Sequence, residues 1–222
     1  MSTTAARPTR STRSPGWAPF ALLAVVLVPA VAGSLRLVEL GGGPHLMPPD
    51  ARLTGSPIPL AVHIVSALLL AGFGAFQLSA SFRRRRPRWH RVAGRVLVVV
   101  GLAVAASALW LTLLLPRQPG TGELAFLLRL AFGTGLVVAL VLGVAAIRRG
   151  DVPRHRGWMT RAYALALGAG TQVVTEGVGL AVFGPQVPTR DVALGVAWVL
   201  NLAIAEVVIR RGARVPVARA GG

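Results

Sequence analysis

The sequence predicts an all-α integral membrane protein, a bundle of six transmembrane helices with both termini in the cytoplasm. Of its 222 residues, 54% are hydrophobic and only 14% are charged, which is too little polar surface for a soluble domain of this length. Apolar stretches of about 20 residues, the length that crosses a hydrocarbon core of about 30 Å, recur along the chain. Arginine clusters fall at every second junction between these stretches.

The elements follow in a simple order. Residues 1–15 are polar and basic, and we expect a disordered cytoplasmic tail because they contain little that a core would bury. The membrane domain covers residues 16–211, and residues 212–222 form a second cytoplasmic tail. The six spans are expected at about residues 17–37, 58–82, 92–115, 124–147, 158–183 and 192–209.

Helix breakers and arginines set the ends of these spans. The first span is followed by a Gly- and Pro-rich stretch at 41–49, the third stops at Pro116, and the fifth stops at Gly184. The second, fourth and sixth spans end in arginines, namely Arg83 to Arg86, Arg148 and Arg149, and Arg210 and Arg211. Pro29 can kink the first span where neighbouring helices compensate for the lost hydrogen bond.

The first span has a competing interpretation. A basic tail, an apolar run and then Ala30, Val31 and Ala32 resemble a signal peptide with its cleavage site. The apolar pattern continues to Leu40, which favours a retained span. Cleavage would leave five spans and would not change the sidedness of the other loops.

The distribution of arginine gives the orientation. Seventeen of the 24 arginines lie in the two tails and in the loops after the second and fourth spans, and four lie in the opposite loops. The positive-inside rule therefore places both termini in the cytoplasm, and we expect a bacterial plasma membrane. The clusters are expected to contact anionic lipid head groups. Nucleic acid is not expected as a partner, because the basic residues occupy short loops between spans, and a homo-oligomer is left open.

Ionisable side chains inside the spans should face the bundle interior and pair, because lipid solvates them poorly. At about 1.5 Å per helical residue, the depth of Arg129 and Glu176 makes them a natural ion pair near the outer face. Near the inner face, Glu206 is expected to neutralise Arg95 or Arg161. The full polar set comprises His63, Gln77, Arg95, Arg129, Arg161, Gln172, Glu176 and Glu206.

Two interpretations of this set stay open. A three-four repeat of small and polar residues along the second and fifth spans is typical of a polar seam that holds helices together. Alternatively, His63, Arg129 and Glu176 form the site of a small proton-coupled transporter.

A weak internal repeat suggests a third possibility. Pro, Arg and His-Arg occur at His90 after the second span and again at His155 after the fourth. Spans two and three would then repeat as spans four and five, with His90 and His155 at matching depth on opposite sides of a four-helix bundle. Two such imidazoles could be axial ligands of a b-type haem in an electron-transfer protein, although both lie shallow for a buried porphyrin.

Other chemistry is not favoured. The chain has no cysteine, which excludes disulfides, thiolate catalysis and iron–sulfur ligation. It has no phosphate-binding glycine loop, no His-Glu-x-x-His and no Gly-x-Ser-x-Gly. Asp50, Asp151 and Asp191 are assigned to loops, too scattered for a metal site. We therefore expect no catalytic residue and no metal, and no cofactor unless haem b binds.

Three segments of the chain carry a recognisable set of residues: His63, Gly72 and Gln77; Pro87, His90, Arg91, Gly94 and Arg95; and His155, Arg156, Trp158, Met159, Arg161 and Tyr163. Together these segments resemble a bacterial family of membrane proteins known as domain of unknown function 2306, over about residues 59–209. The resemblance implies a multi-pass membrane location and no settled activity, so an enzyme is not favoured. The leading interpretation is a multi-pass membrane protein of unknown activity, a binding or scaffold module.

Overall fold

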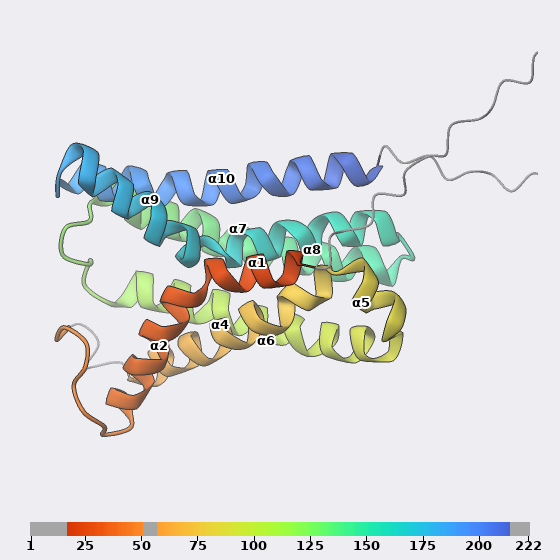
Figure 1. Cartoon of the computed structure of the whole chain (residues 1–222), viewed down its shortest axis with the longest axis horizontal. Coiled ribbons are helices and arrows are strands. Elements are labelled where there is room, and N and C mark those ends of the chain that lie inside the picture. Colours follow the sequence, from red (N-terminus) through yellow and green to blue (C-terminus); the bar gives the residue numbers. More distant parts are fainter. Residues whose placement is uncertain (1–16, 51–56, 214–222) are drawn as a thin grey trace, which may run out of the picture.

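A computed structural model describes residues 17–50 and 57–213, and within these ranges all regular structure is helical. The tails predicted at 1–15 and 212–222 lie outside the described residues, except for 212 and 213. The helices are α1 (Ala18–Val25), α2 (Leu27–Leu40), α4 (Pro57–Leu78), α5 (Ala80–Arg85), α6 (Pro87–Leu114), α7 (Glu123–Arg148), α8 (Val152–Ala166), α9 (Gly168–Phe183) and α10 (Val187–Ala213) (Figure 1).

Four of these helices, α4, α6, α7 and α10, are long and apolar enough to cross a membrane. Two further pairs pass the same test together but are bent, α1 with α2 by 52° and α8 with α9 by 47°. The described chain thus has four candidate spans, or up to six if each bent pair is one span. The exact count of six and the orientation stay predictions.

The second span ends earlier than residue 82. Helix α4 stops at Leu78, and the Ser79 hydroxyl accepts a hydrogen bond from the backbone N–H of Phe82 (3.4 Å) to start α5. The Phe82 ring packs edge-on against Trp89 at 4.7 Å, which holds α5 against the start of α6. The arginine run from Arg83 therefore begins inside a short separate helix.

A ring of four helices forms the centre of the fold. Contacts run from α4 to α6, from α6 to α7, from α7 to α8, and from α8 back to α4, so that α6 and α8 are diagonal. Leu70, Val104, Leu140 and Leu165, one from each helix, belong to the buried core inside this ring. Helix α10 packs on α7, α8 and α9, while α1 and α2 lie along α4, and α2 reaches α9 (Figure 1).

The fifth span, expected to be continuous over 158–183, is broken at Leu167. There is no proline here; instead the Trp198 indole of α10 fills the notch at Gly168, where an added Cβ would overlap it. The indole Nε1 donates to the Leu165 carbonyl (3.1 Å), and the Phe132 ring supports the indole at 4.6 Å. A backbone acceptor next to the break is thus satisfied, as a membrane interior requires.

The first span breaks at Val26, three residues before Pro29. Pro29 has no N–H to donate to the carbonyl four residues earlier, which belongs to Val25. Gly170 of α9 packs on that carbonyl, since a Cβ at Gly170 would lie 2.5 Å from the Val25 oxygen. Val26 and Leu167 belong to one buried cluster, so the two breaks pack together.

This contact predicts the effect of one methyl group. Gly170→Ala should lower the free energy of unfolding by about 1–3 kcal/mol, because the methyl meets backbone that cannot rotate away. Gly177→Ala, also in α9 but with nothing near its Cβ position, should change it by less than about 1 kcal/mol. Detergent-solubilised protein titrated with SDS and followed by circular dichroism gives both values. Equal effects would show that the two breaks do not pack closely.

Candidate functional site

A cavity of about 290 Å³ lies inside the bundle where α9 bends away from the ring. Most of its lining is apolar, including Ala105 and Ala108 of α6 and Trp198 of α10. The polar lining comes from four helices and consists of His63, Thr112, Arg129 and Gln172. No Asp or Glu of the described chain lines it.

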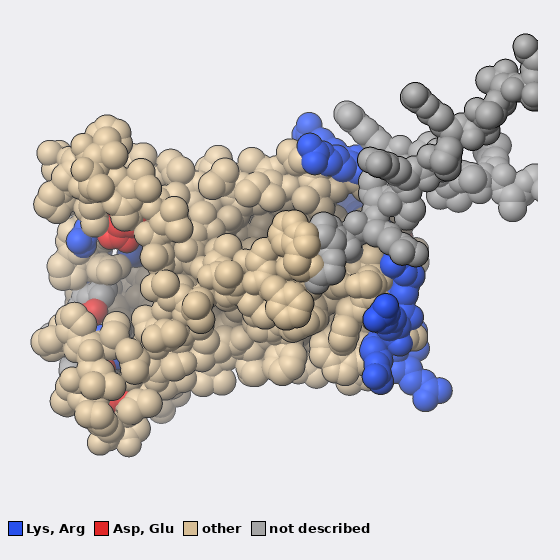
Figure 2. Space-filling model, in the orientation of Figure 1, with Lys and Arg blue, Asp and Glu red and all other residues tan. Residues whose placement is uncertain are grey.

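A second space of about 220 Å³, here called the vestibule, lies next to this cavity at one end of the bundle. The two spaces share three lining residues, Leu111, Thr112 and Arg129. Arg129 Nη2 donates to Gln118 Oε1 (2.9 Å) on the vestibule side. Figure 2 shows this end hollowed, with both acidic and basic side chains around the hollow, while a larger group of arginines lies at the opposite end.

His63 is held in the cavity wall by its Nδ1 atom. That nitrogen lies 3.2 Å from Ser107 Oγ and 3.3 Å from the Val104 carbonyl oxygen. The Ser107 hydroxyl donates to the Ala103 carbonyl (2.6 Å), so both neighbours of Nδ1 act as acceptors and Nδ1 carries the proton. In the neutral ring Nε2 is then the proton-accepting atom, and it forms no hydrogen bond with another described residue.

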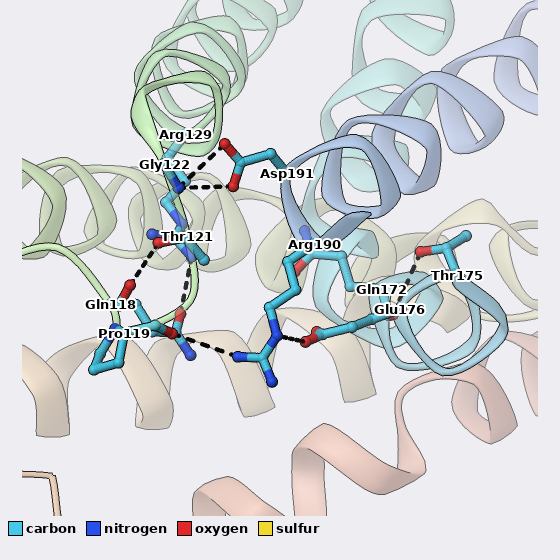
Figure 3. Close-up of polar contacts among 10 residues, drawn as sticks. All are labelled: Gln118, Pro119, Thr121, Gly122, Arg129, Gln172, Thr175, Glu176, Arg190 and Asp191. Carbon is cyan, nitrogen blue, oxygen red and sulfur yellow. Dashed lines mark hydrogen bonds and ion pairs between the residues drawn. The ribbon is translucent and has the colours of Figure 1, made fainter. Parts of the chain in front are cut away.

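Polar contacts at the vestibule end differ from the expected ion pair (Figure 3). Glu176 pairs with Arg190 (3.5 Å) rather than with Arg129, and it does not line the cavity. Arg190 also donates to the Pro119 carbonyl (3.4 Å), which ties α10 to the loop before α7. The expected depth of Glu176 in the membrane could not distinguish Arg129 from Arg190 as its partner. The bend of α9 sets the direction in which the Glu176 side chain points.

Asp191, assigned from the sequence to a loop, lies inside α10 and is 3% exposed. Its carboxylate accepts hydrogen bonds from the backbone N–H groups of Gly122 (2.9 Å) and Ala125 (3.2 Å). These are orphan donors at the first turn of α7, so Asp191 caps a helix from another part of the chain. Pro188, a residue favoured in a first helical turn, is the sequence signal for the earlier start of α10.

A second polar group lies in the arginine-rich half. Arg161 Nε and Nη2 donate to the two carboxylate oxygens of Glu206 (2.5 and 3.0 Å), joining α8 to α10. The Arg161 guanidinium also lies over the Trp158 ring at 4.9 Å. Arg95 takes no part in this pair; it is exposed on α6, and no acid of the described chain pairs with it.

The two histidines proposed as haem ligands occupy equivalent places. His90 is the fourth residue of α6 and His155 the fourth of α8, on diagonal helices, close enough for their charges to interact. His155 Nδ1 donates to the Gly143 carbonyl (2.9 Å). His90 Nδ1 and both amide atoms of Gln77 are buried without a partner among the described residues.

Haem binding stays a prediction, and neither described cavity lies between these histidines. If His90 and His155 are axial ligands, protein purified from haem-supplied cells will show a Soret band. His90→Ala would then change its low-spin spectrum. A visible spectrum without that band contradicts the haem interpretation.

The role of Asp191 is tested by comparing two acids at the same end. Asp191→Ala should lower the free energy of unfolding by about 1–3 kcal/mol, because it leaves two buried N–H groups without an acceptor. Glu123→Ala should cost less than about 1 kcal/mol, since the Glu123 pair with Arg117 is exposed. SDS titration measures both. A loss at Asp191 no larger than that at Glu123 would contradict the capping role.

Comparison with known proteins supports the membrane assignment. A family model described as "Predicted membrane protein (DUF2306)" matches residues 60–209, from α4 into α10. No curated protein and no solved structure matches the chain. The chain therefore belongs to the family of predicted membrane proteins designated domain of unknown function 2306.

Proposed function

We propose that this membrane protein is a small-solute transporter that binds its substrate in the cavity between α4, α6, α7 and α9. The observation that carries the proposal is a largely apolar cavity next to the vestibule, whose polar groups, His63, Thr112, Arg129 and Gln172, come from four separate helices. Convergent polar groups in an apolar pocket are typical of ligand sites. Glu176 lines neither the cavity nor the vestibule and pairs with Arg190.

The lining favours an organic monoanion with a short apolar tail, such as a carboxylate or sulfonate. A guanidinium carries five N–H donors, so Arg129 can donate to Gln118 and to an anion at the same time. No acid of the described lining opposes a negative ligand, and the alanines, Phe132 and Trp198 would contact the tail. A volume of about 290 Å³ suits a ligand of a few carbon atoms.

Orientation belongs to the same proposal. The arginine-rich end would face the cytoplasm of a bacterial cell and the vestibule would face outward. Figure 2 supports this, since the arginines of α5 and those of the last turn of α10 gather at the end opposite the hollow. Positive residues are retained on the cytoplasmic side of a plasma membrane.

Proton coupling would act through His63. With Nδ1 donating into the helix wall, Nε2 can accept a proton beside the bound anion, so that anion and proton cross as a neutral pair. Arg161 and Glu206, by contrast, join two helices in the other half of the bundle and serve as the polar seam.

Ligand binding is tested with hexanoate and uncharged hexanol as a matched pair. Hexanoate should raise the melting temperature of the solubilised protein saturably, and hexanol should raise it less, because only the carboxylate can accept from Arg129. Arg129→Gln should remove the difference between the two. Arg117→Gln, at a residue that lines only the vestibule, should preserve it. Equal shifts with both compounds in the unmodified protein would contradict an anion site.

Coupling is tested with hexanesulfonate, which remains charged and so does not cross lipid as a neutral acid. In proteoliposomes, an acidic exterior should speed its uptake several-fold. His63→Gln should abolish that acceleration, because the amide cannot carry the proton. An uptake rate in the unmodified protein that is the same with and without the pH gradient would contradict proton coupling.

A further inference from the structure

The arginine-rich end contains buried polar atoms that the rest of the fold does not use. Both amide atoms of Gln77 and the Nδ1 atom of His90 are buried with no hydrogen-bond partner among the described residues. Gln77 Oε1 lies 3.6 Å from the Cβ position at Gly94, which is one turn along α6 from His90. The two unpartnered groups therefore line the same stretch of α6.

Cations lie close to His90 at this end of the bundle. Arg83 is half-buried on α5 and lies within electrostatic range of His90. Burial lowers the pKa of the Arg83 guanidinium, and the neighbouring charges of Arg156 and Arg84 lower it further. These positive groups thus crowd one another from α5 and α8.

Acids at this end are engaged elsewhere. The Asp151 carboxylate accepts from the backbone N–H of Arg154 (3.0 Å) at the start of α8. Glu206 pairs with Arg161. No ion pair within the described chain involves Arg83 or Arg156.

We propose that Arg83, Arg156, His90 and Gln77 form a binding site for a phosphate group, carried by an anionic lipid head group or free in solution. Phosphate oxygens accept several hydrogen bonds and carry the charge that paired guanidinium groups hold best. The imidazole and amide would supply two further donors from the buried side.

The site differs from a diffuse basic surface because Arg83 is held in place. Phe82, the residue before it, packs against Phe76 at 5.8 Å and Trp89 at 4.7 Å, and Ser79 caps the helix. Arg84, Arg85 and Arg86 are exposed and have no such support. Phosphate binding at a defined site should depend on Arg83 and Gln77. Binding to a diffuse basic patch should weaken equally when any arginine of the run is replaced.

Native mass spectrometry of the full-length protein, titrated with phosphatidylglycerol and with phosphatidylcholine of the same acyl chains, tests this proposal. Phosphatidylglycerol should bind about tenfold more tightly than phosphatidylcholine. Arg83→Gln should remove most of that preference, and Gln77→Met, which replaces the amide by a group of similar size, should weaken it several-fold. Arg85→Gln is the matched control and should change it about twofold or less.

Competition by sodium phosphate separates the two sources. If sodium phosphate displaces phosphatidylglycerol from the unmodified protein but not from Arg83→Gln, free phosphate is a ligand of the site. If sodium phosphate does not displace phosphatidylglycerol, the lipid head group is the ligand. Equal binding of the two lipids would overturn the proposal. Equal losses in Arg83→Gln and Arg85→Gln, with circular dichroism showing both folded, would overturn it as well.

Discussion

The hydrogen bond from the Trp198 indole to the Leu165 carbonyl is the interaction on which the rest of the structure depends. A helix inside a membrane can break only where its released backbone groups find another partner, because lipid offers none. Trp198 supplies the donor and also fills the notch at Gly168. The bend of 47° between α8 and α9 follows, and with it the divergence of α9 that leaves the cavity of about 290 Å³.

A similar arrangement occurs at Tyr163 on the other side of α8. Its hydroxyl donates to the Ala71 carbonyl of α4 (2.9 Å), and its ring packs where a Cβ at Gly74 would lie. An aromatic donor beside a glycine thus links α8 to α4, as Trp198 links it to α10. Val26 and Leu167 pack in the same cluster as Tyr163, so the bend of the first helix pair fits against the bend of the second.

The fold could be predicted from the sequence in outline because hydropathy and arginine placement report directly on lipid. The membrane class and the approximate ends of α6 and α7 follow from them, while the family follows from the three motif segments. The break at Leu167 could not, since its residues are as apolar as an unbroken span and its cause, Trp198, is 31 residues away in sequence. The break at Ser79 could not be predicted either, because a single hydroxyl ahead of the arginine run does not by itself mark the start of a new helix.

For the candidate site, the sequence indicated the depth of the polar residues but not the partners of their side chains. Depth brought His63 and Arg129 to the same level, and they do line one cavity. The direction in which a side chain points depends on the tertiary structure and could not be predicted from depth. Glu176 pairs with Arg190, and Asp191 accepts hydrogen bonds at the start of α7. The sequence identifies Gln77 and His90 as polar residues, which are costly to bury in lipid. Only the fold shows that their side chains have buried polar atoms without a hydrogen-bond partner among the described residues.

A substrate site in the cavity requires that water reach the middle of the bundle through the vestibule. Because the chain has no cysteine, a single one can be placed at Ala108 in the cavity wall or at Val99, which is 67% exposed on the outer surface of the same helix. Thiols react as thiolates, which need water. A membrane-impermeant thiol reagent should label the cysteine at 108 quickly from the vestibule side and leave the one at 99 unmodified. Equal inertness of both positions, from either side of the membrane, would contradict the account.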